Sequence, residues 1–237
     1  MTILNLETST NICSIALSKD GMIIYDHTEK GNEKGSQASE KLGTMVDEAM
    51  KALEERRLKL DAVAVSSGPG SYTGLRIGTS MAKGIAYGSD ARLIAVPTLE
   101  LLCVAPLLSS VTSDLSPLLC PMLDARRMEV FAAVYDTSLK VLRAPQPDIV
   151  DADTYRQFLD EHPVYFFGNG AGKCMEVINH PNAHYIPDVQ PLARNMMPLA
   201  EKRFCNGQFE DVAYFTPDYL KAYQAKLPKN PLIPHQV

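Results

Sequence analysis

The sequence predicts an α/β fold of two similar lobes that face each other across a cleft. In both halves of the chain, three strand-like segments precede a helix, a strand and a second helix. In both halves an acid ends the first strand, Glu7 in "LNLETSTNICSIAL" and Asp124 in "PMLDARRMEVFAAV". A Gly-x-Gly turn also follows a later strand twice, in "VAVSSGPG" and in "VYFFGNGAG". Such a repeated pattern indicates repeated structural units, although the two halves share a pattern rather than residue identity.

The first lobe is predicted to begin with a β-hairpin. Apolar residues alternate over residues 3–17, and "KDG" (19–21) supplies the Asp-Gly pair that a tight turn favours before "MIIYDHTE". A polar loop, "EKGNEKGS", follows. A helix near 36–55 is indicated by a stripe at helical spacing, formed by Leu42, Met45, Val46, Ala49, Met50 and Leu53. The remaining elements are a strand at 61–67, a helix at 74–88, a strand at 92–97 and a helix at 98–109.

The second lobe is predicted to repeat this order. We expect strands in "SPLLCPMLDA", "RMEVFAAVYD" and "KVLRAPQPDIV", a helix in "DTYRQFLDE", a strand in "VYFFGNG" and a helix in "GKCMEVINH". We place the N-terminal, partner-binding lobe at 1–103 and the C-terminal lobe at 104–237. A last helix near 216–225 is expected to pack back on the first lobe.

Composition excludes several classes of protein. The net charge of −5 gives no whole-chain signature of nucleic-acid binding, although a local basic patch stays possible. The opening "MTILNLETST" does not resemble a signal peptide, and no segment approaches the roughly 20 apolar residues of a membrane span. Five cysteines lie far apart with no CxxC pair, which is typical of reduced thiols. We therefore expect a cytoplasmic protein without a membrane segment or a structural zinc site.

The stretch "GPGSYTGLRIG" (68–78) is the most distinctive motif. Glycines that allow close backbone approach, followed by a helix N-terminus, could bind a phosphate. The motif is not a P-loop, because the Gly-Lys-Ser/Thr ending is missing, and Thr73 stands where a dinucleotide-binding turn needs its third glycine. Phosphate binding is therefore one interpretation among others.

Small residues continue along the predicted helix at 74–88. They form one stripe at Gly74, Gly78, Ala82 and Ala86 and a second at Ser80, Gly84 and Gly88. Because each glycine inside a helix costs about 1 kcal/mol relative to alanine, close approach of another backbone should offset the cost. That backbone could belong to the chain's own sheet or to another chain. An apolar ridge of Ile77, Met81 and Ile85 lies beside the first stripe.

Four segments carry a resemblance to a known family. The segments "ILNLETSTNICSIAL", "SSGPGSYTGLRIGTSMAKGIAYG", "AVPTLE" and "LDARRMEVFAAVYD" resemble TsaB, also called YeaZ, with weaker echoes in "GNGAGK" and "TPDYLKAY". TsaB is the non-catalytic subunit of the bacterial machinery that forms N6-threonylcarbamoyladenosine at position 37 of ANN-decoding tRNAs. The resemblance implies the actin/sugar kinase/Hsp70-like ATPase (ribonuclease H-like) fold.

The resemblance also implies partners. The chain should dimerise with the catalytic subunit TsaD through the first-lobe helices and stabilise it, with the ATPase TsaE as a further partner. A homodimer is expected when TsaD is absent, and tRNA contact should be only indirect. The residues expected at the partner surface are Leu42, Met45, Met50, Tyr72, Thr73, Gly74, Arg76, Ile77, Gly78, Met81, Ala82 and Ile85.

Catalytic residues, metal ligands and a cofactor are not expected. TsaD-type proteins have two metal-binding histidines where this chain has Thr98 and Leu102, and neither residue supplies an imidazole. Relatives commonly have Asp where Glu7 stands, and "GSQASEKL" lacks a histidine that often precedes the helix. The resemblance implies a vestigial nucleotide cleft at Glu7, Ser9, Asp124, Gly168 and Gly170. Weak binding of a nucleotide there stays possible.

Two features leave local alternatives open. "DARR" (124–127) could hold an anion or an acid of a partner, or it could form an internal ion pair. His180 and His184 have i, i+4 spacing, but Pro181 makes a shared helical face improbable, so a surface or turn role is expected.

Three other functions are compatible with a chain of this fold. A stand-alone kinase or ATPase would need tight binding of Mg-ATP, and a metalloprotease would need metal ligands that the sequence does not offer. A purely homodimeric binding module is the third.

Overall fold

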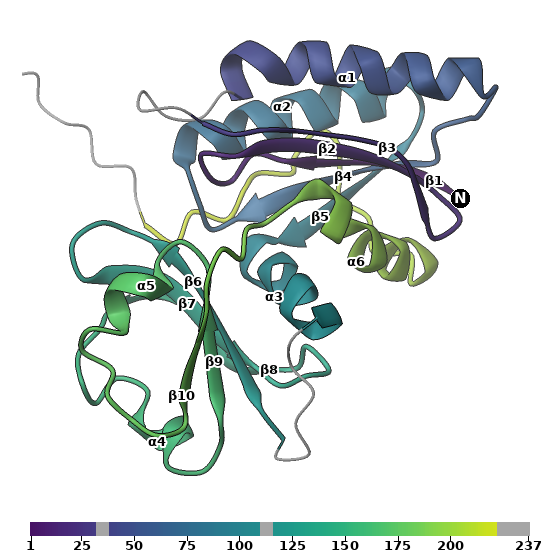
Figure 1. Ribbon diagram of the computed structural model, residues 1–237. Coiled ribbons are helices and arrows are strands. Elements are labelled where there is room, and N and C mark those ends of the chain that lie inside the picture. Colours follow the sequence, from purple (N-terminus) through teal and green to yellow (C-terminus); the bar gives the residue numbers. More distant parts are fainter. Residues whose placement is uncertain (32–37, 110–115, 222–237) are drawn as a thin grey trace, which may run out of the picture.

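Two five-stranded sheets with the same topology build the protein (Figure 1). The computed structural model describes residues 1–31, 38–109 and 116–221. The strand order is β3-β2-β1-β4-β5 in the first sheet and β8-β7-β6-β9-β10 in the second. In each sheet the first three strands are antiparallel, and the last two run parallel to the first. The predicted α/β fold of two similar lobes is therefore confirmed.

The strands agree largely with the sequence pattern. Those of the first sheet are β1 (Thr2–Glu7), β2 (Cys13–Lys19), β3 (Met22–Glu29), β4 (Ala62–Gly68) and β5 (Arg92–Pro97). Those of the second are β6 (Leu118–Asp124), β7 (Glu129–Tyr135), β8 (Val141–Ile149), β9 (Val164–Phe167) and β10 (Ala183–Ile186). Pro145 and Pro147 lie in β8, an edge strand, where a missing N–H is tolerated.

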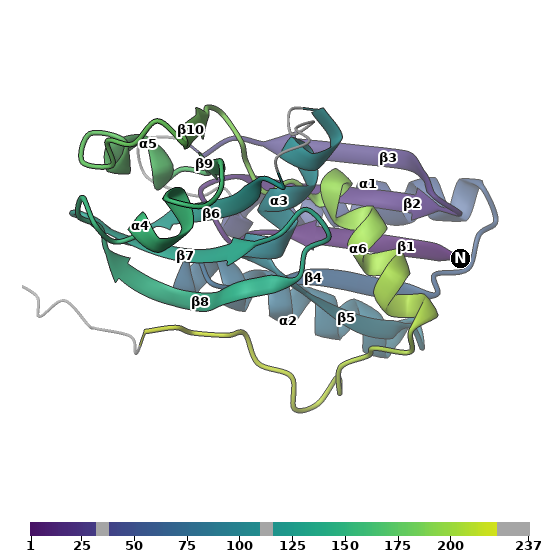
Figure 2. The ribbon, with the colours of Figure 1, turned by 90° about the horizontal axis from the view of Figure 1, so that it is seen from below.

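Helices cover both faces of the first sheet. As Figures 1 and 2 show, α1 (Ala38–Glu55) and α2 (Tyr72–Gly88) lie side by side on one face, and α3 (Thr98–Ser109) and α6 (Ala193–Cys205) lie on the other. The apolar stripe of α1 packs with Leu4, Leu6 and Val65 in one core, and α6 packs with α3 and β5 in another. No helix in the described part of the chain is long and apolar enough to span a membrane.

Several elements differ from the sequence prediction. The predicted helices at 153–161 and 172–180 shorten to single turns, α4 (Arg156–Leu159) and α5 (Ala171–Cys174). Helix α6 and strand β10 were not predicted, and the division placed at 103/104 falls inside α3. Residues 216–221 are not helical; the rest of the helix predicted near 216–225 lies outside the described residues, as does most of the polar loop after β3.

The C-terminal segment, residues 208–221, runs beside the first lobe and reaches the second (Figure 2). Glu210 donates its backbone N–H to Leu93 O at 2.9 Å, so the segment bonds to the edge of β5. Further along, Asp218 donates its N–H to Ser67 O at 2.7 Å. The segment thereby forms one wall of the space between the lobes.

Candidate functional site

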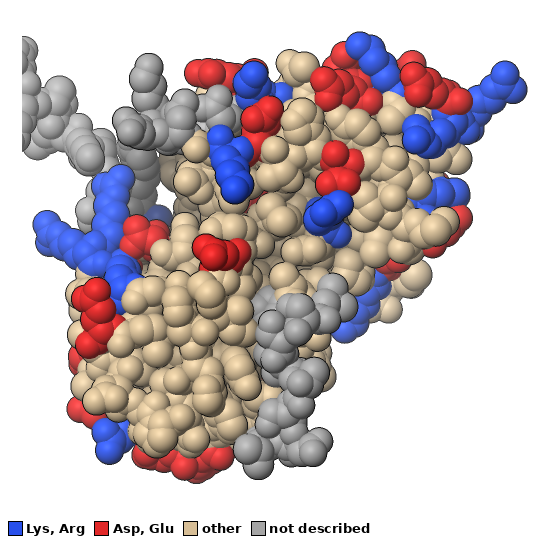
Figure 3. Space-filling view, in the orientation of Figure 1, with Lys and Arg blue, Asp and Glu red and all other residues tan. Residues whose placement is uncertain are grey.

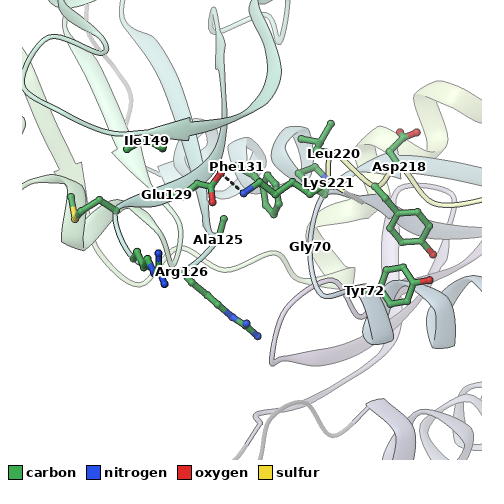
Figure 4. Close-up of a pocket in the computed structure, with 14 residues that line it drawn as sticks. Gly70, Tyr72, Ala125, Arg126, Glu129, Phe131, Ile149, Asp218, Leu220 and Lys221 are labelled. Carbon is green, nitrogen blue, oxygen red and sulfur yellow. Dashed lines mark ion pairs between the residues drawn. The ribbon is translucent and has the colours of Figure 1, made fainter. Parts of the chain in front are cut away.

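A hollow between the two lobes is the candidate site. Its larger part has a volume of about 970 Å³ and opens between the β1–β2 turn, the start of α2 and the β6–β7 turn. An adjoining part of about 770 Å³ lies against residues 218–221. Figure 4 shows the ion pair from Lys221 to Glu129 between the C-terminal segment and the second lobe, and Arg126 projecting from the β6–β7 turn.

The glycines of "GPGSYTG" bring the start of α2 against the β1–β2 turn. A Cβ at Gly74 would overlap the carbonyl oxygen of Thr8, and a Cβ at Gly70 would overlap that of Ser9. The Thr8 hydroxyl donates to Gly74 O at 2.8 Å, and Ser71 donates its N–H to Ser9 O at 2.6 Å. These contacts account for the glycines without a phosphate.

The second lobe uses its Gly-x-Gly turn in the same way. Gly168 has a φ of +96°, like Gly68 with +108°, and both values favour glycine. A Cβ at Gly168 would overlap Met122 O, and a Cβ at Gly170 would lie 2.8 Å from the carbonyl carbon of Leu123. Both glycines are therefore required by packing against β6.

Glu7 lies behind the hollow rather than in it. The carboxylate is fully buried, and Ser9 donates both its backbone N–H and its hydroxyl to Glu7 Oε1 at 2.5 Å. The buried Ser66 hydroxyl also acts on this carboxylate. Burial raises the pKa of Glu7 to about 7, although the hydrogen bonds from Ser9 act in the opposite direction. Of the five residues predicted for the vestigial cleft, Ser9 and Asp124 line the hollow, whereas Glu7, Gly168 and Gly170 support its walls.

Asp124 forms the internal ion pair that was one of the alternatives for "DARR". Its partner is Lys173 of α5, a residue that the sequence analysis did not single out. Asp124 also donates its N–H to Asn169 Oδ1 at 2.9 Å. Arg126 and Arg127, in contrast, are exposed and form no ion pair with the described residues. Beside the hollow, the turn therefore presents two cations that pair with no acid in the described part of the chain, and Figure 3 shows basic side chains gathered where the second lobe approaches the first.

Residues 98–102, where the resemblance implied a lost pair of metal ligands, begin α3 and carry a carboxylate that pairs with α6. Thr98 and Leu102 are buried, and Glu100 accepts from Arg203 Nη2 of α6 at 2.6 Å. Among the described residues, no group of three or more His, Cys, Asp or Glu side chains is arranged to hold a metal ion. His184 stacks on Tyr165 in β9, and His180 lies 3.5 Å from Asp160, so the two histidines do not converge.

The predicted partner surface is smaller than the sequence suggested. Leu42 and Met45 are 1% exposed in the chain's own core, and Ala82 is buried there as well. Gly74 is buried against Thr8, and so is Gly78, whose Cβ would overlap the Thr8 hydroxyl. A buried residue offers no surface to another chain, so these five are corrected to intramolecular contacts. The first small-residue stripe of α2 therefore faces its own lobe.

Four of the predicted partner residues in α2 are not buried, and together with Ser80 and Gly84 they form a shallow groove. It has a volume of about 620 Å³ and is lined by Arg76, Ile77, Ser80, Met81, Gly84 and Ile85. A Cβ at Gly84 would meet nothing within 4 Å, so this second stripe is open. Of the other predicted partner residues, Thr73 is exposed, and Tyr72 and Met50 are half-buried.

The C-terminal segment contacts the first lobe, where the sequence analysis placed residues near 216–225, but its individual partners were not predicted. Lys83 of α2 donates to the carbonyl oxygens of Ala213 and Phe215 at 2.9 and 3.1 Å. The ring centroids of Tyr72 and Tyr219 lie 4.8 Å apart. The echo in "TPDYLKAY" was the only available signal, because these contacts join residues more than 100 positions apart.

Comparison with known proteins decides the family. The model of the TsaD family, tRNA N6-adenosine threonylcarbamoyltransferase, matches residues 33–226. The chain is 28% identical over 232 residues to the tRNA threonylcarbamoyladenosine biosynthesis protein TsaB of Bacillus subtilis, covering 95% of this chain and 96% of that protein. The chain belongs to the TsaD-related TsaB (YeaZ) family. TsaB of Escherichia coli is 27% identical and covers 93% of this chain and 95% of its own length.

A solved structure supports the same assignment. YeaZ from Pseudomonas aeruginosa superposes with a TM-score of 0.75 at 25% identity and covers 92% of this chain and 99% of its own. The TsaB proteins of B. subtilis and E. coli thus match this chain nearly end to end. The TsaD of Caldicellulosiruptor saccharolyticus, in contrast, is 32% identical over 42% of this chain and 34% of its own length.

Proposed function

We propose that this protein is an accessory subunit in the formation of N6-threonylcarbamoyladenosine in tRNA. It would pair with the catalytic subunit TsaD, stabilise it, and present the pair to TsaE. Two proteins named for this biosynthesis match this chain over nearly its whole length, and this similarity supports the proposal. In this role the chain needs no catalytic constellation of its own.

The groove on α2 is the observation that carries the pairing proposal. Ile77, Met81 and Ile85 form an apolar ridge that packs only partly against the chain's own core. Ser80 and Gly84 beside it leave room for a second helix to approach closely. A helix from another chain laid along this groove would bury the ridge. The same surface would give a homodimer when TsaD is absent.

The test compares Met81, a half-buried methionine that lines the groove, with Met22, an exposed methionine on β3. Met81→Lys should abolish co-purification with TsaD and lower threonylcarbamoyladenosine formation by the reconstituted complex, because it places a charge inside the apolar contact. Met22→Lys, a matched change at a methionine 66% exposed on β3, should leave both unchanged. Equal binding by the two variants would show that α2 is not the interface. Sedimentation of each variant alone would report the homodimer.

We also propose that the isolated chain binds nucleotide weakly at most. The two acids expected to serve a metal-bound nucleotide are engaged elsewhere, Glu7 by burial beside Ser9 and Asp124 by Lys173. A calorimetric titration with Mg-ATP should therefore show no micromolar affinity. Micromolar binding would favour the stand-alone ATPase instead.

A further inference from the structure

The ammonium group of Lys173 lies in a cradle of three oxygens. Besides the Asp124 carboxylate, it donates to the carbonyl oxygens of Arg127 at 2.5 Å and Glu129 at 2.8 Å. An ammonium has three N–H donors and no acceptor, so all three are used. The Lys173 side chain is 25% exposed, so most of its length is covered by protein.

The oxygens belong to a turn whose backbone is unfavourable by itself. Arg126 and Arg127 have φ values of 75° and 50°, in the left-handed region that favours glycine. Such a conformation persists only where the surroundings hold it. Two hydrogen bonds close the turn, from Ala125 N to Glu129 O and from Glu129 N to Arg126 O, both at 3.1 Å.

The cradle has the composition of a cation site. A carboxylate and two carbonyl oxygens are the ligands that hard cations prefer, and three such dipoles pointing at one place repel one another without a positive charge between them. Lys173 supplies that charge from a different element, α5, 49 residues along the chain.

We propose that Lys173 is a tethered cation that takes the place of a bound metal ion and holds the turn at 124–129. The turn then directs Arg126 and Arg127 to the interlobe hollow whether or not any ion is present. Lys173 acts as a positioning residue, and the cationic edge of the hollow depends on it. This inference is independent of the proposed partner.

Chemical rescue tests the proposal. Lys173→Ala removes three carbons and the ammonium, which together correspond to n-propylammonium. The variant should unfold about 3–8 °C below the wild type. Added n-propylammonium chloride should recover part of this loss in a concentration-dependent way. Tetramethylammonium chloride at equal ionic strength should not, because it has no N–H donor. Lys140→Ala, at an exposed lysine in the β7–β8 turn, should show neither loss nor rescue.

A second readout separates positioning from general stability. Amide hydrogen exchange at residues 124–129 should accelerate in Lys173→Ala and in Lys173→Met, which keeps most of the side-chain stem. It should slow again with n-propylammonium only in Lys173→Ala, because the methionine side chain fills the space that the additive would occupy. Equal stabilisation of wild type and variant by n-propylammonium would overturn the proposal. So would unchanged exchange of the turn in either variant.

Discussion

The hydroxyl of Thr8 donates a hydrogen bond to the carbonyl oxygen of Gly74 at 2.8 Å and fixes the β1–β2 turn against the first turn of α2. The contact is possible only because position 74 has no side chain. Gly78, one turn later, leaves space for the same threonine. Gly74 and Gly78 therefore stabilise the lobe from within.

Replacement of Gly74 by alanine should lower the free energy of unfolding by about 2–4 kcal/mol, because the new methyl group would overlap the Thr8 carbonyl. Gly84→Ala is the matched control in the same helix. A Cβ at Gly84 meets nothing within 4 Å, so this change should raise stability by about 0.5–1 kcal/mol. Urea unfolding of both variants measures the difference. Equal effects at the two positions would contradict this account of the glycines.

The sequence predicted strongly periodic elements well and long-range contacts poorly. The hairpin of the first lobe, α1 and α2 follow from alternation and helical spacing, and the repeated pattern gave the two lobes. Helix α6 was missed because Pro198 interrupts its pattern, although Met196, Leu199 and Ala200 are buried at helical spacing. Strand β10 was missed because its four residues, AHYI, are too few to show a clear alternation of apolar and polar side chains.

In the candidate site, too, local motifs were predicted and long-range contacts were not. The motif "GPGSYTG" predicted a special turn, but sequence spacing cannot say whether a small-residue stripe faces its own lobe or a partner. Lys173 could not be found from the sequence, because its role depends on carbonyl oxygens of a turn 44–46 residues away. Glu7 was expected beside the cleft, and only the three-dimensional packing shows that its carboxylate points into the core.

Glu7 should make stability depend on pH. Its pKa is raised from 4.5 to about 7 in the folded protein by burial, so between these values the folded state keeps a proton that the unfolded state has released. Stability is therefore fully present below pH 4.5 and falls as the pH rises toward 7, by about 3 kcal/mol in total. Above pH 7 both states are deprotonated and the loss is complete.

Glu7→Gln should remove this loss, because glutamine is neutral and its carbonyl oxygen can still accept from Ser9. The difference in unfolding free energy between variant and wild type should grow from pH 5 to pH 8 in favour of the variant. Glu54→Gln, at an exposed position of α1, should show no such trend. A difference that stays constant with pH would indicate that Glu7 is ionised in the folded protein throughout.

The ion pair of Glu100 with Arg203 should contribute to stability by joining α3 to α6. The two side chains are only 18% and 17% exposed, so loss of the guanidinium leaves a poorly solvated carboxylate. Arg203→Met should cost about 1–3 kcal/mol in urea unfolding. Arg156→Met, at an exposed arginine with surface acidic partners, should cost about 0–1 kcal/mol. If Glu100→Gln added to Arg203→Met caused a further full loss, the two residues would not act as a pair.

Lys83 should hold the C-terminal segment to the first lobe. Its ammonium bonds to two carbonyl oxygens of that segment, at Ala213 and Phe215, and three residues later the Asp218 N–H bonds to Ser67. Lys83→Met removes the first two bonds, so the segment should open more often, and the Asp218 amide should exchange about tenfold faster, corresponding to ~1.4 kcal/mol. Lys51→Met, at a surface lysine that pairs with Asp47, should leave that exchange rate unchanged. An unaltered Asp218 amide in Lys83→Met would mean that the segment is held by Ser67, Tyr72 and Glu129 without the lysine.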